Sequence, residues 1–313
     1  MELIQGIKKF RAPASGLAVT IGNFDGVHCG HRTLVSRLVN YGQEHSLPSM
    51  VMIFEPQPLE FFEPQSAPPR IMSFEDKVAA LAELGVDYVL LLSFDEAFSQ
   101  QSPEQFIVEL LVQGAQVKHL IIGDDFRFGK CRAGDFQLLF ETGKHYGFSV
   151  ENTASIVIDG QRVSSTRVRH LLAQGDFDQA AQLLGAPFSI RGPVIHGRAL
   201  GRTIDVPTAN ILLNRLKSPV QGVFVVDWLD QEGRTCQGVA NVGTRPTVNG
   251  QGELLEVHLF DCDADLYGVE AQVTFLKKLR DEQRFSDVEQ LKNQIGKDIE
   301  QARVFLAART CTN

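Results

Sequence analysis

Short runs of apolar residues alternate with helical patterns along the first half of the chain. A strand that is apolar at every position is typical of a parallel sheet covered on both faces. The strands expected here are GLAVTIG, SMVMIFE, DYVLLLSF and HLIIG, separated by helical patterns over about 30–44, 73–85 and 102–114. The first half is therefore predicted to be an α/β domain whose ligands bind beyond the carboxyl ends of its strands.

Local signals place the ends of these helices. Ser73 and Ser102 stand where N-caps are expected, and Pro103 suits the first turn of the helix that Ser102 opens. The stretch 56–69 holds five prolines. It is predicted to be neither helix nor central strand, because proline lacks the amide hydrogen that both ladders require.

The second half of the chain has a different pattern. From Phe188 onward, alternating strands are separated by glycine turns, and residues 223–242 indicate a hairpin. One long helix follows from Ser286, opened by a predicted capping box of Ser286 and Glu289. These elements predict a small β-barrel with a terminal α-helix. We place the boundary near Gly185, which gives domains 1–185 and 186–313.

Charge, apolar runs and cysteines exclude some classes of protein. The chain of 313 residues has a net charge of -8, which argues against a nucleic-acid partner. Its longest apolar runs are too short to span a bilayer, so no membrane association is expected. Five scattered cysteines without a C-x-x-C pair indicate reduced thiols and a cytoplasmic location. We expect a monomer or a weak homo-oligomer.

The turn IGNFDGVHCGH, residues 21–31, is the strongest local signal. A metal site is disfavoured because no second Cys/His cluster has suitable spacing. A nucleophilic Cys29 is disfavoured because the turn has no nucleophile-elbow signature and nothing obvious to position a base. A phosphate site fits, since a glycine turn before a helix presents backbone N–H groups and a positive dipole. His28 and His31 share one helical face, so both imidazoles can point at one anion. Gly30 between them is expected to let a nucleotide approach the backbone.

This turn and the motifs after it occur in the same order as in one known protein family. They are Gly22-x-Phe24-Asp25-Gly26-Val27-His28-x-Gly30-His31, then FEPQP, GDDFRFG, SSTRVR, GRALG, PTAN, GVANVGTRPT, LEVHLFD, DLYG and LRDEQRF. This set resembles the bacterial bifunctional riboflavin kinase/FAD synthetases over nearly the whole chain. The resemblance implies a Rossmann-like nucleotidyltransferase domain followed by a β-barrel riboflavin kinase domain.

In the first domain the resemblance implies transfer of AMP from ATP to FMN. His28 and His31 would hold ATP phosphates above the turn of Gly22, Phe24, Asp25 and Gly26. Ser164, Ser165 and Thr166 are N-cap residues for the following helix. Arg169 can face one anion together with Ser165 and Thr166, because it lies four and three positions beyond them. Arg167 is expected to be a solvated surface charge.

For FMN, the resemblance points to the proline-rich loop and to GDDFRFG. Pro56 and Pro58 would form a rigid wall, and Phe62 or Phe128, or alternatively Phe54, would pack on the isoalloxazine ring. Asp125 of the second motif completes this set. Phenylalanine is more often a core residue, so burial in the core is the alternative for each ring.

In the second domain, Thr208 and Asn210 of PTAN share one face if the segment is extended, and their oxygens suit Mg²⁺. The resemblance makes Glu256 the general base, and its alternation within LLEVHLFD would point it into a barrel mouth. His258 is expected to be structural. By resemblance, Gly197 and Gly201 would form a loop over the nucleotide. Arg280, Glu282 and Phe285 would lie beside the flavin.

The resemblance thus implies an enzyme with two ATP sites that makes FMN from riboflavin and then FAD from FMN, with Mg²⁺ accompanying ATP. Its partners would be the small molecules ATP, riboflavin and FMN. One alternative keeps only the kinase active, with a regulatory N-terminal module. An RNA-linked relative of tRNA synthetases would need a Lys-Met-Ser-Lys-Ser loop, which the sequence lacks. A passive flavin-binding protein would not need PTAN and SSTRVR together.

Overall fold

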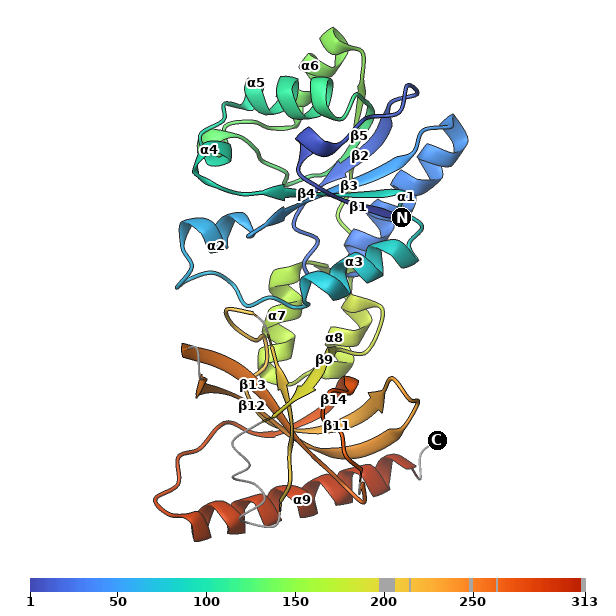
Figure 1. The fold of residues 1–313 in the computed structure, drawn as a ribbon. Helices are drawn as coiled ribbons and strands as arrows, with labels where there is room; N and C mark the ends of the chain where they lie inside the picture. Colours follow the sequence, from blue (N-terminus) through green and yellow to red (C-terminus); the bar gives the residue numbers. More distant parts are fainter. Residues whose placement is uncertain (197–205, 214, 248–249, 263, 311–313) are drawn as a thin grey trace. The chain divides into compact units, whose positions relative to one another are not determined.

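The structure is a computed structural model that describes residues 1–196, 206–213, 215–247, 250–262 and 264–310. It contains two compact units (Figure 1). The first comprises Met1–Pro68 and Phe74–Ser164, and the second comprises Pro69–Ser73 and Ser165–Asn313. None of the helices in the described ranges combines the length and apolar character that a membrane crossing requires.

The first unit is built on a six-stranded sheet in the order β1-β4-β3-β2-β5-β6. Every pairing in it is parallel, as the apolar runs predicted. Its strands are β1 (Glu2–Gln5), β2 (Leu17–Ile21), β3 (Ser49–Glu55), β4 (Tyr88–Ser93), β5 (Val117–Gly123) and β6 (Ser149–Thr153). The predicted α/β fold with a parallel sheet is confirmed.

Helices cover both faces of this sheet because alternate strand residues point to opposite sides. Odd-numbered residues of β2 join a core with the π-helix Phe106–Gly114 and α6 (Phe136–Tyr146). Even-numbered Ala18 joins a second core with α1 (Cys29–His45) and α3 (Phe74–Glu83). The remaining elements are η1 (Ile7–Lys9), α4 (Glu96–Ser99), α5 (Pro103–Gln105), η3 (Lys130–Arg132), and the hairpin of β7 (Val157–Ile158) and β8 (Gln161–Arg162).

Two local features differ from the sequence pattern. The proline-rich stretch contains a short helix, α2 (Pro58–Phe62), so the prediction of no helix there was wrong. Pro58 stands in its first turn, where no amide hydrogen is needed, and Gln57 with Glu60 forms a capping box. Ser102 caps α5 as predicted, but the helix continues as a π-helix rather than as α.

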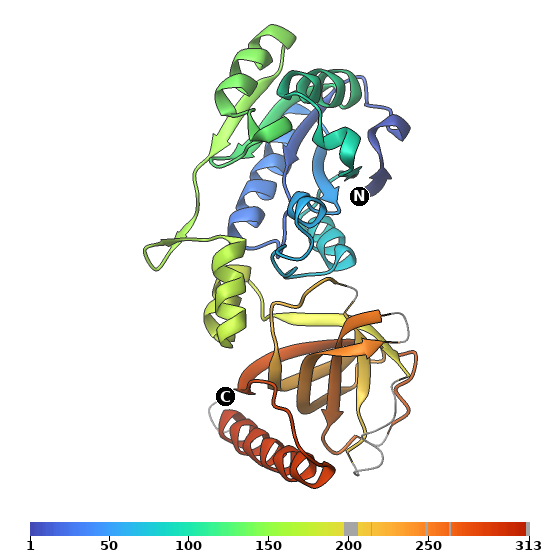
Figure 2. The same ribbon diagram turned by 90° about the vertical axis from the view of Figure 1, so that its left-hand side faces the viewer.

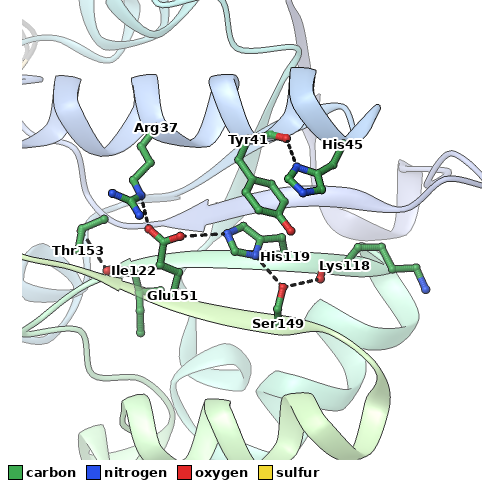
Figure 3. A network of polar contacts seen from close by, with 9 residues as sticks. All are labelled: Arg37, Tyr41, His45, Lys118, His119, Ile122, Ser149, Glu151 and Thr153. Carbon is green, nitrogen blue, oxygen red and sulfur yellow. Dashed lines mark hydrogen bonds and ion pairs between the residues drawn. The ribbon is translucent and has the colours of Figure 1, made fainter.

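A polar network lies where β5 and β6 meet α1 (Figure 3). His119, which is 4% exposed, has its Nδ1 2.7 Å from Ser149 Oγ and its Nε2 3.7 Å from a Glu151 carboxylate oxygen. Tyr41 stacks on the His119 ring at 3.6 Å, and Arg37 forms an ion pair with Glu151. Burial lowers the pKa of His119, although the Glu151 charge opposes that shift.

The second unit contains a closed barrel in the order β10-β13-β12-β11-β14-β9, in which all pairings are antiparallel. Its strands are β9 (Ser189–Ile195), β10 (Ala209–Leu212), β11 (Gly222–Asp230), β12 (Thr235–Thr247), β13 (Gly250–Leu259) and β14 (Glu270–Arg280). Phe224, Trp228 and Phe275 are buried in its core. The predicted small barrel and the predicted hairpin of β11 and β12 are confirmed.

The terminal helix α9 (Val288–Thr310) lies along the outside of the barrel (Figure 2). Its Ala302 and Leu306 pack with Val225 and Phe260 of the barrel. The predicted helix is present, but its cap is not Ser286. The Gln290 amide donates to Asp287 Oδ1 at 2.8 Å, and this bond, with one from Ser286, lowers the pKa of Asp287.

Two short helices, α7 (Ser165–Gln174) and α8 (Phe177–Leu184), belong to the second compact unit. The Phe177 ring of α8 lies 5.9 Å from that of Phe224 and 5.8 Å from that of Phe275, so α8 extends the barrel core. By chain contacts the units divide between Ser164 and Ser165. The functional boundary near Gly185 stays a prediction.

Candidate functional sites

The turn between β2 and α1 holds the two histidines side by side. His28 is the N-cap of α1, and its Nδ1 accepts a hydrogen bond from the His31 amide at 3.3 Å. The two imidazole rings stack at 3.6 Å with an interplanar angle of 11°. The spacing of His28 and His31 predicted this adjacency. A helix N-terminus with paired imidazoles beyond a parallel strand is chemically suited to a polyphosphate.

The backbone of this turn is held by burial rather than by glycine alone. Phe24 and Val27 have φ of 48° and 36°, which is unfavourable for residues with side chains, and they are 2% and 0% exposed. Asp25 is 2% exposed. The tight packing of these residues therefore keeps a turn that their intrinsic preferences disfavour.

The glycines of the motif make room for neighbouring side chains. A Cβ added to Gly30 would lie 3.2 Å from two ring atoms of His28, and one added to Gly22 would lie 3.1 Å from the Phe24 ring. Gly26 has φ of 85°, so it alone of these three adopts the left-handed conformation. Gly30 thus permits the His28 ring to fold over the start of α1, a role that the sequence pattern does not reveal.

The residues expected to hold FMN differ in accessibility. Phe62 is 57% exposed, and its ring lies 5.6 Å from that of Phe94. Phe128 is 6% exposed and packs on Phe106 at 5.0 Å, so it contributes to the core. Phe54, 9% exposed, also belongs to that core. Pro56 and Pro58 flank Gln57 at the end of β3. Of these three phenylalanines, Phe62 presents the most surface to a ligand.

Asp125 is exposed and lies beside a residue that the sequence pattern did not single out. Arg162 Nη2, from β8, lies 2.9 Å from Asp125 Oδ2 and 3.1 Å from Asp124 Oδ1. Ser155 Oγ donates to Asp124 at 2.8 Å. The β7–β8 hairpin is therefore tied to the loop that follows β5. No spacing rule links Arg162 to Asp125, because the contact depends on how the hairpin folds back.

The segment 164–169 spans the end of one unit and the start of the next. Ser164 closes the first unit, whereas Ser165, Thr166 and Arg169 lie on α7 in the second. Arg169 Nε donates to the Pro69 carbonyl at 2.7 Å. Arg167 and Arg169 are both partly exposed, so the expectation that Arg167 is a solvated surface charge stays a prediction.

In the second unit, a cavity of about 610 Å³ collects five predicted residues, Thr208, Glu256, Arg280, Glu282 and Phe285. Asn210, 5% exposed, lies directly opposite Glu256 in the β10–β13 ladder and donates from Nδ2 to the Thr208 carbonyl at 3.2 Å. Gly197 and Gly201 lie outside the described residues. Residues far apart in the chain thus meet at one site.

The cavity lies between the outer face of the barrel and α9. Leu255 and Val257, on either side of Glu256 in β13, are 0% exposed, while Glu256 lines the cavity. Because strand side chains alternate, Glu256 points away from the barrel interior. The expectation that it faces a barrel mouth was wrong, since α9 converts the outer face into a pocket wall.

The residues that line this cavity without having been predicted include Asn241 and Asp298. Asn241 lies opposite Glu256 in the β12–β13 ladder, so strand alternation could have found it once the pairing was known. Asp298, 2% exposed on α9, binds the Arg280 guanidinium. Nothing in the sequence separates Asp298 from the other acidic residues of that helix. A Cβ added to Gly243 would overlap the Glu282 carboxylate, which therefore lies against β12.

Two family models match the chain, one over each part. The model described as FAD synthetase matches residues 11–167, and the model described as riboflavin kinase matches residues 184–306. A curated protein of Escherichia coli K12, named bifunctional riboflavin kinase/FMN adenylyltransferase, is 50% identical over 97% of this chain and 98% of its own. The chain belongs to this bifunctional family.

Other members of the family agree over the same length. The proteins of that name from Pseudomonas fluorescens and Haemophilus influenzae are 47% and 46% identical, each over 97% or more of this chain. A solved structure titled as a macrolide-efflux protein from Streptococcus pneumoniae has a TM-score of 0.77 and 31% identity, covering 96% of this chain and 98% of its own. Both domains of the family are present. The bifunctional interpretation is therefore favoured over the alternative in which only the kinase is active and the N-terminal module is regulatory.

Proposed function

We propose that this chain phosphorylates riboflavin with ATP in its C-terminal domain, 186–313, and adenylylates FMN with a second ATP in its N-terminal domain, 1–185. The observation that supports the kinase assignment best is the cavity that holds Glu256, Thr208 and Arg280 together. The observation that supports the adenylyltransferase assignment is the stacked His28–His31 pair at the start of α1.

In the kinase reaction, Glu256 accepts the proton of the riboflavin ribityl hydroxyl. The hydroxyl oxygen then attacks the γ-phosphorus of ATP, and ADP leaves. Asn241 lines the same cavity and is placed to donate a hydrogen bond to a ligand there. The apolar side chains Val223, Val239, Phe285, Leu291, Ile295 and Ile299 line the rest of that cavity and suit a flat aromatic ring.

Thr208 and Asn210 fit a magnesium ion accompanying ATP. Their hydroxyl and amide oxygens are hard, neutral donors, and Mg²⁺ in such sites takes few protein ligands because phosphates and waters complete its shell. The hydrogen bond from Asn210 to the Thr208 carbonyl holds the two residues together. When bound, the ion neutralises charge on the transferring phosphoryl group.

In the adenylyl transfer, a phosphate oxygen of FMN attacks the α-phosphorus of ATP, and pyrophosphate leaves. No protein nucleophile is needed, so the unit acts by positioning and by charge stabilisation. His28, His31 and the N-terminus of α1 hold the phosphates of ATP, and Arg169 with Ser164, Ser165 and Thr166 contributes further donors. Phe62, Pro56, Pro58 and Asp125 bind the flavin.

Two less specific proposals accompany this one. We propose a cytoplasmic location, which the free thiols of Cys29, Cys131, Cys236 and Cys262 support. We also propose that the chain acts as a monomer or a weak homo-oligomer on small molecules alone.

The direct test incubates the purified chain with riboflavin, ATP and Mg²⁺ and separates the flavins by chromatography. FMN is expected first and FAD later, and FMN supplied without riboflavin should also yield FAD. Absence of both products under oxidising and reducing conditions would reject the assignment.

A further inference from the structure

Asp298 is a buried carboxylate in the wall of the kinase cavity. It is 2% exposed and projects from α9 toward the end of β14. Arg280 Nε donates to its two oxygens at 3.0 and 3.1 Å, and Arg280 Nη2 donates to Oδ2 at 2.8 Å. Gln294 Nε2 donates to Oδ1 at 2.9 Å. Four hydrogen bonds from two side chains therefore hold the Asp298 carboxylate.

A buried ion pair at this position needs an explanation beyond stability. Removing two charges from water costs about as much as their attraction returns, so an apolar pair of similar size is often no less stable. The surrounding side chains Leu291, Ile295 and Ile299 would accept such a replacement chemically. The charged pair is better explained by what it holds in place.

Arg280 connects Asp298 to the segment that links β14 to α9. Its Nη1 donates to the Asp281 carbonyl at 3.1 Å, and its guanidinium lies 5.8 Å from the Phe285 ring centre. Residues 281–287 form neither helix nor strand, so they have no regular backbone ladder to fix their path. Yet Glu282, Gln283 and Phe285 of this segment line the cavity. The ion pair therefore anchors one end of a pocket wall that has no ladder of its own.

We propose that Asp298 is a positioning residue of the kinase reaction. Acting through Arg280, it holds segment 281–287 in place as the wall that faces the flavin. It also keeps the Arg280 guanidinium fixed against the Phe285 ring. This inference rests on the proposed riboflavin kinase function of the cavity. Thr208 directly precedes β10 and Glu256 lies on β13, so neither belongs to this segment. Loss of Asp298 therefore changes flavin binding and leaves the phosphoryl transfer itself intact.

The first test replaces Asp298→Asn, which keeps the shape and removes the charge. Losing a charge-assisted hydrogen bond is expected to raise the KM for riboflavin about tenfold or more. The KM for ATP and kcat should stay within about twofold. Glu300→Gln is the matched control, because Glu300 is an exposed carboxylate on the same helix. It should leave all three constants unchanged.

A double-mutant cycle distinguishes positioning from simple support of α9. If Asp298 acts through Arg280, Asp298→Asn has no further effect on the riboflavin KM in an Arg280→Met background. An equal rise in both backgrounds overturns the proposal, as does a loss of kcat with KM unchanged, or a fall in Tm alone.

Two measurements keep the test decisive. FAD formation from supplied FMN reports the first unit in every preparation and should not change. If Asp298→Asn abolishes the thermal transition of the second unit, Gln294→Leu decides, because it removes one neutral hydrogen bond to the carboxylate. A raised riboflavin KM in that variant supports the proposal, and an unchanged one overturns it. Failure of the wild-type chain to make FMN would instead reject the proposed function.

Discussion

The two units assemble their candidate sites in opposite ways. In the first, the stacked histidines lie in the turn that follows β2. The end of a strand, a turn and the first residues of a helix, all within one short stretch of sequence, provide the phosphate site. In the second, the cavity takes residues from β12, β13, β14 and α9 and from the residues before β10. The histidine turn of the first site is local in sequence, whereas the second site exists only after the barrel closes and α9 packs on it.

This difference teaches where motif reasoning is reliable. A parallel sheet places every strand end at one edge, so a motif after a strand is located by topology alone. A closed barrel offers an inner and an outer face, and strand alternation alone cannot tell which face becomes the pocket. Glu256 shows the consequence, since its alternation was recognised but its face was assigned wrongly.

The largest expected effect separates the two units functionally. Glu256→Gln should lower FMN formation at least about a hundredfold, because a positioned general base contributes that much or more. FAD formation from supplied FMN should stay within about twofold of wild type. Both rates are measured by chromatography of the flavin products.

Glu270→Gln serves as the control for this variant, since Glu270 is an exposed carboxylate on β14 of the same barrel. It should leave both reactions unchanged. Equal loss of both reactions in folded Glu256→Gln would show that the two units do not divide the chemistry.

The next largest effect tests whether helix geometry identifies which arginine of α7 binds the polyphosphate. Arg169→Ala should lower FAD formation from FMN about a hundredfold, because a charge-assisted contact to polyphosphate is lost. Arg167→Ala should lower it no more than about threefold. The rate of FAD formation is compared with the rate of FMN formation in the same preparation.

Arg169 also donates to the Pro69 carbonyl, so thermal unfolding of both variants must accompany the rates. A loss of FAD formation that follows a fall in Tm assigns Arg169 a structural role. Equal effects of the two substitutions would contradict the expectation that only Arg169 faces the anion.

The smallest effect concerns stability of the first unit. Burial lowers the pKa of His119, while Glu151 raises it and both His45 and Arg37 lower it. The unfolded chain, in which a histidine titrates near about 6.5, therefore takes up the proton at a higher pH than the folded state does. The stability contribution is present above that pH and is lost as the pH falls through the lowered pKa. A His119→Gln variant, which cannot titrate, should lose less Tm than wild type between pH 7.5 and pH 5.

Two further side chains of that network contact His119. Tyr41 stacks on the His119 ring, and Ser149 Oγ lies 2.7 Å from His119 Nδ1 (Figure 3). His145→Gln, at an exposed position on α6, is the matched control. If His119→Gln is as acid-sensitive as wild type, the network does not govern the pH response of this unit.

Much of the fold could be predicted because its determinants are short-range. Fully apolar runs predicted the parallel strands β2 to β5, and strand alternation with glycine turns predicted the barrel. The errors were also local. Asp287 replaces Ser286 as the cap because the helix begins one residue later than the pattern suggested. Pro58 opens a helix in a stretch whose proline content argued against one.

The sequence by itself determined the family, the order of the two modules, and a first set of candidate residues for each site, although it missed Asn241, Asp298 and Arg162. Motifs preserve residue type and spacing, and those are enough to recognise chemistry. Only the tertiary structure decided that Phe128 is buried, that Gly30 accommodates the His28 ring, and that Asp298 binds Arg280 in the cavity that Glu256 also lines. Such facts depend on which faces pack together. These contacts join residues that are far apart in the sequence and that no periodic pattern connects. They are therefore known only once the chain has folded and packed.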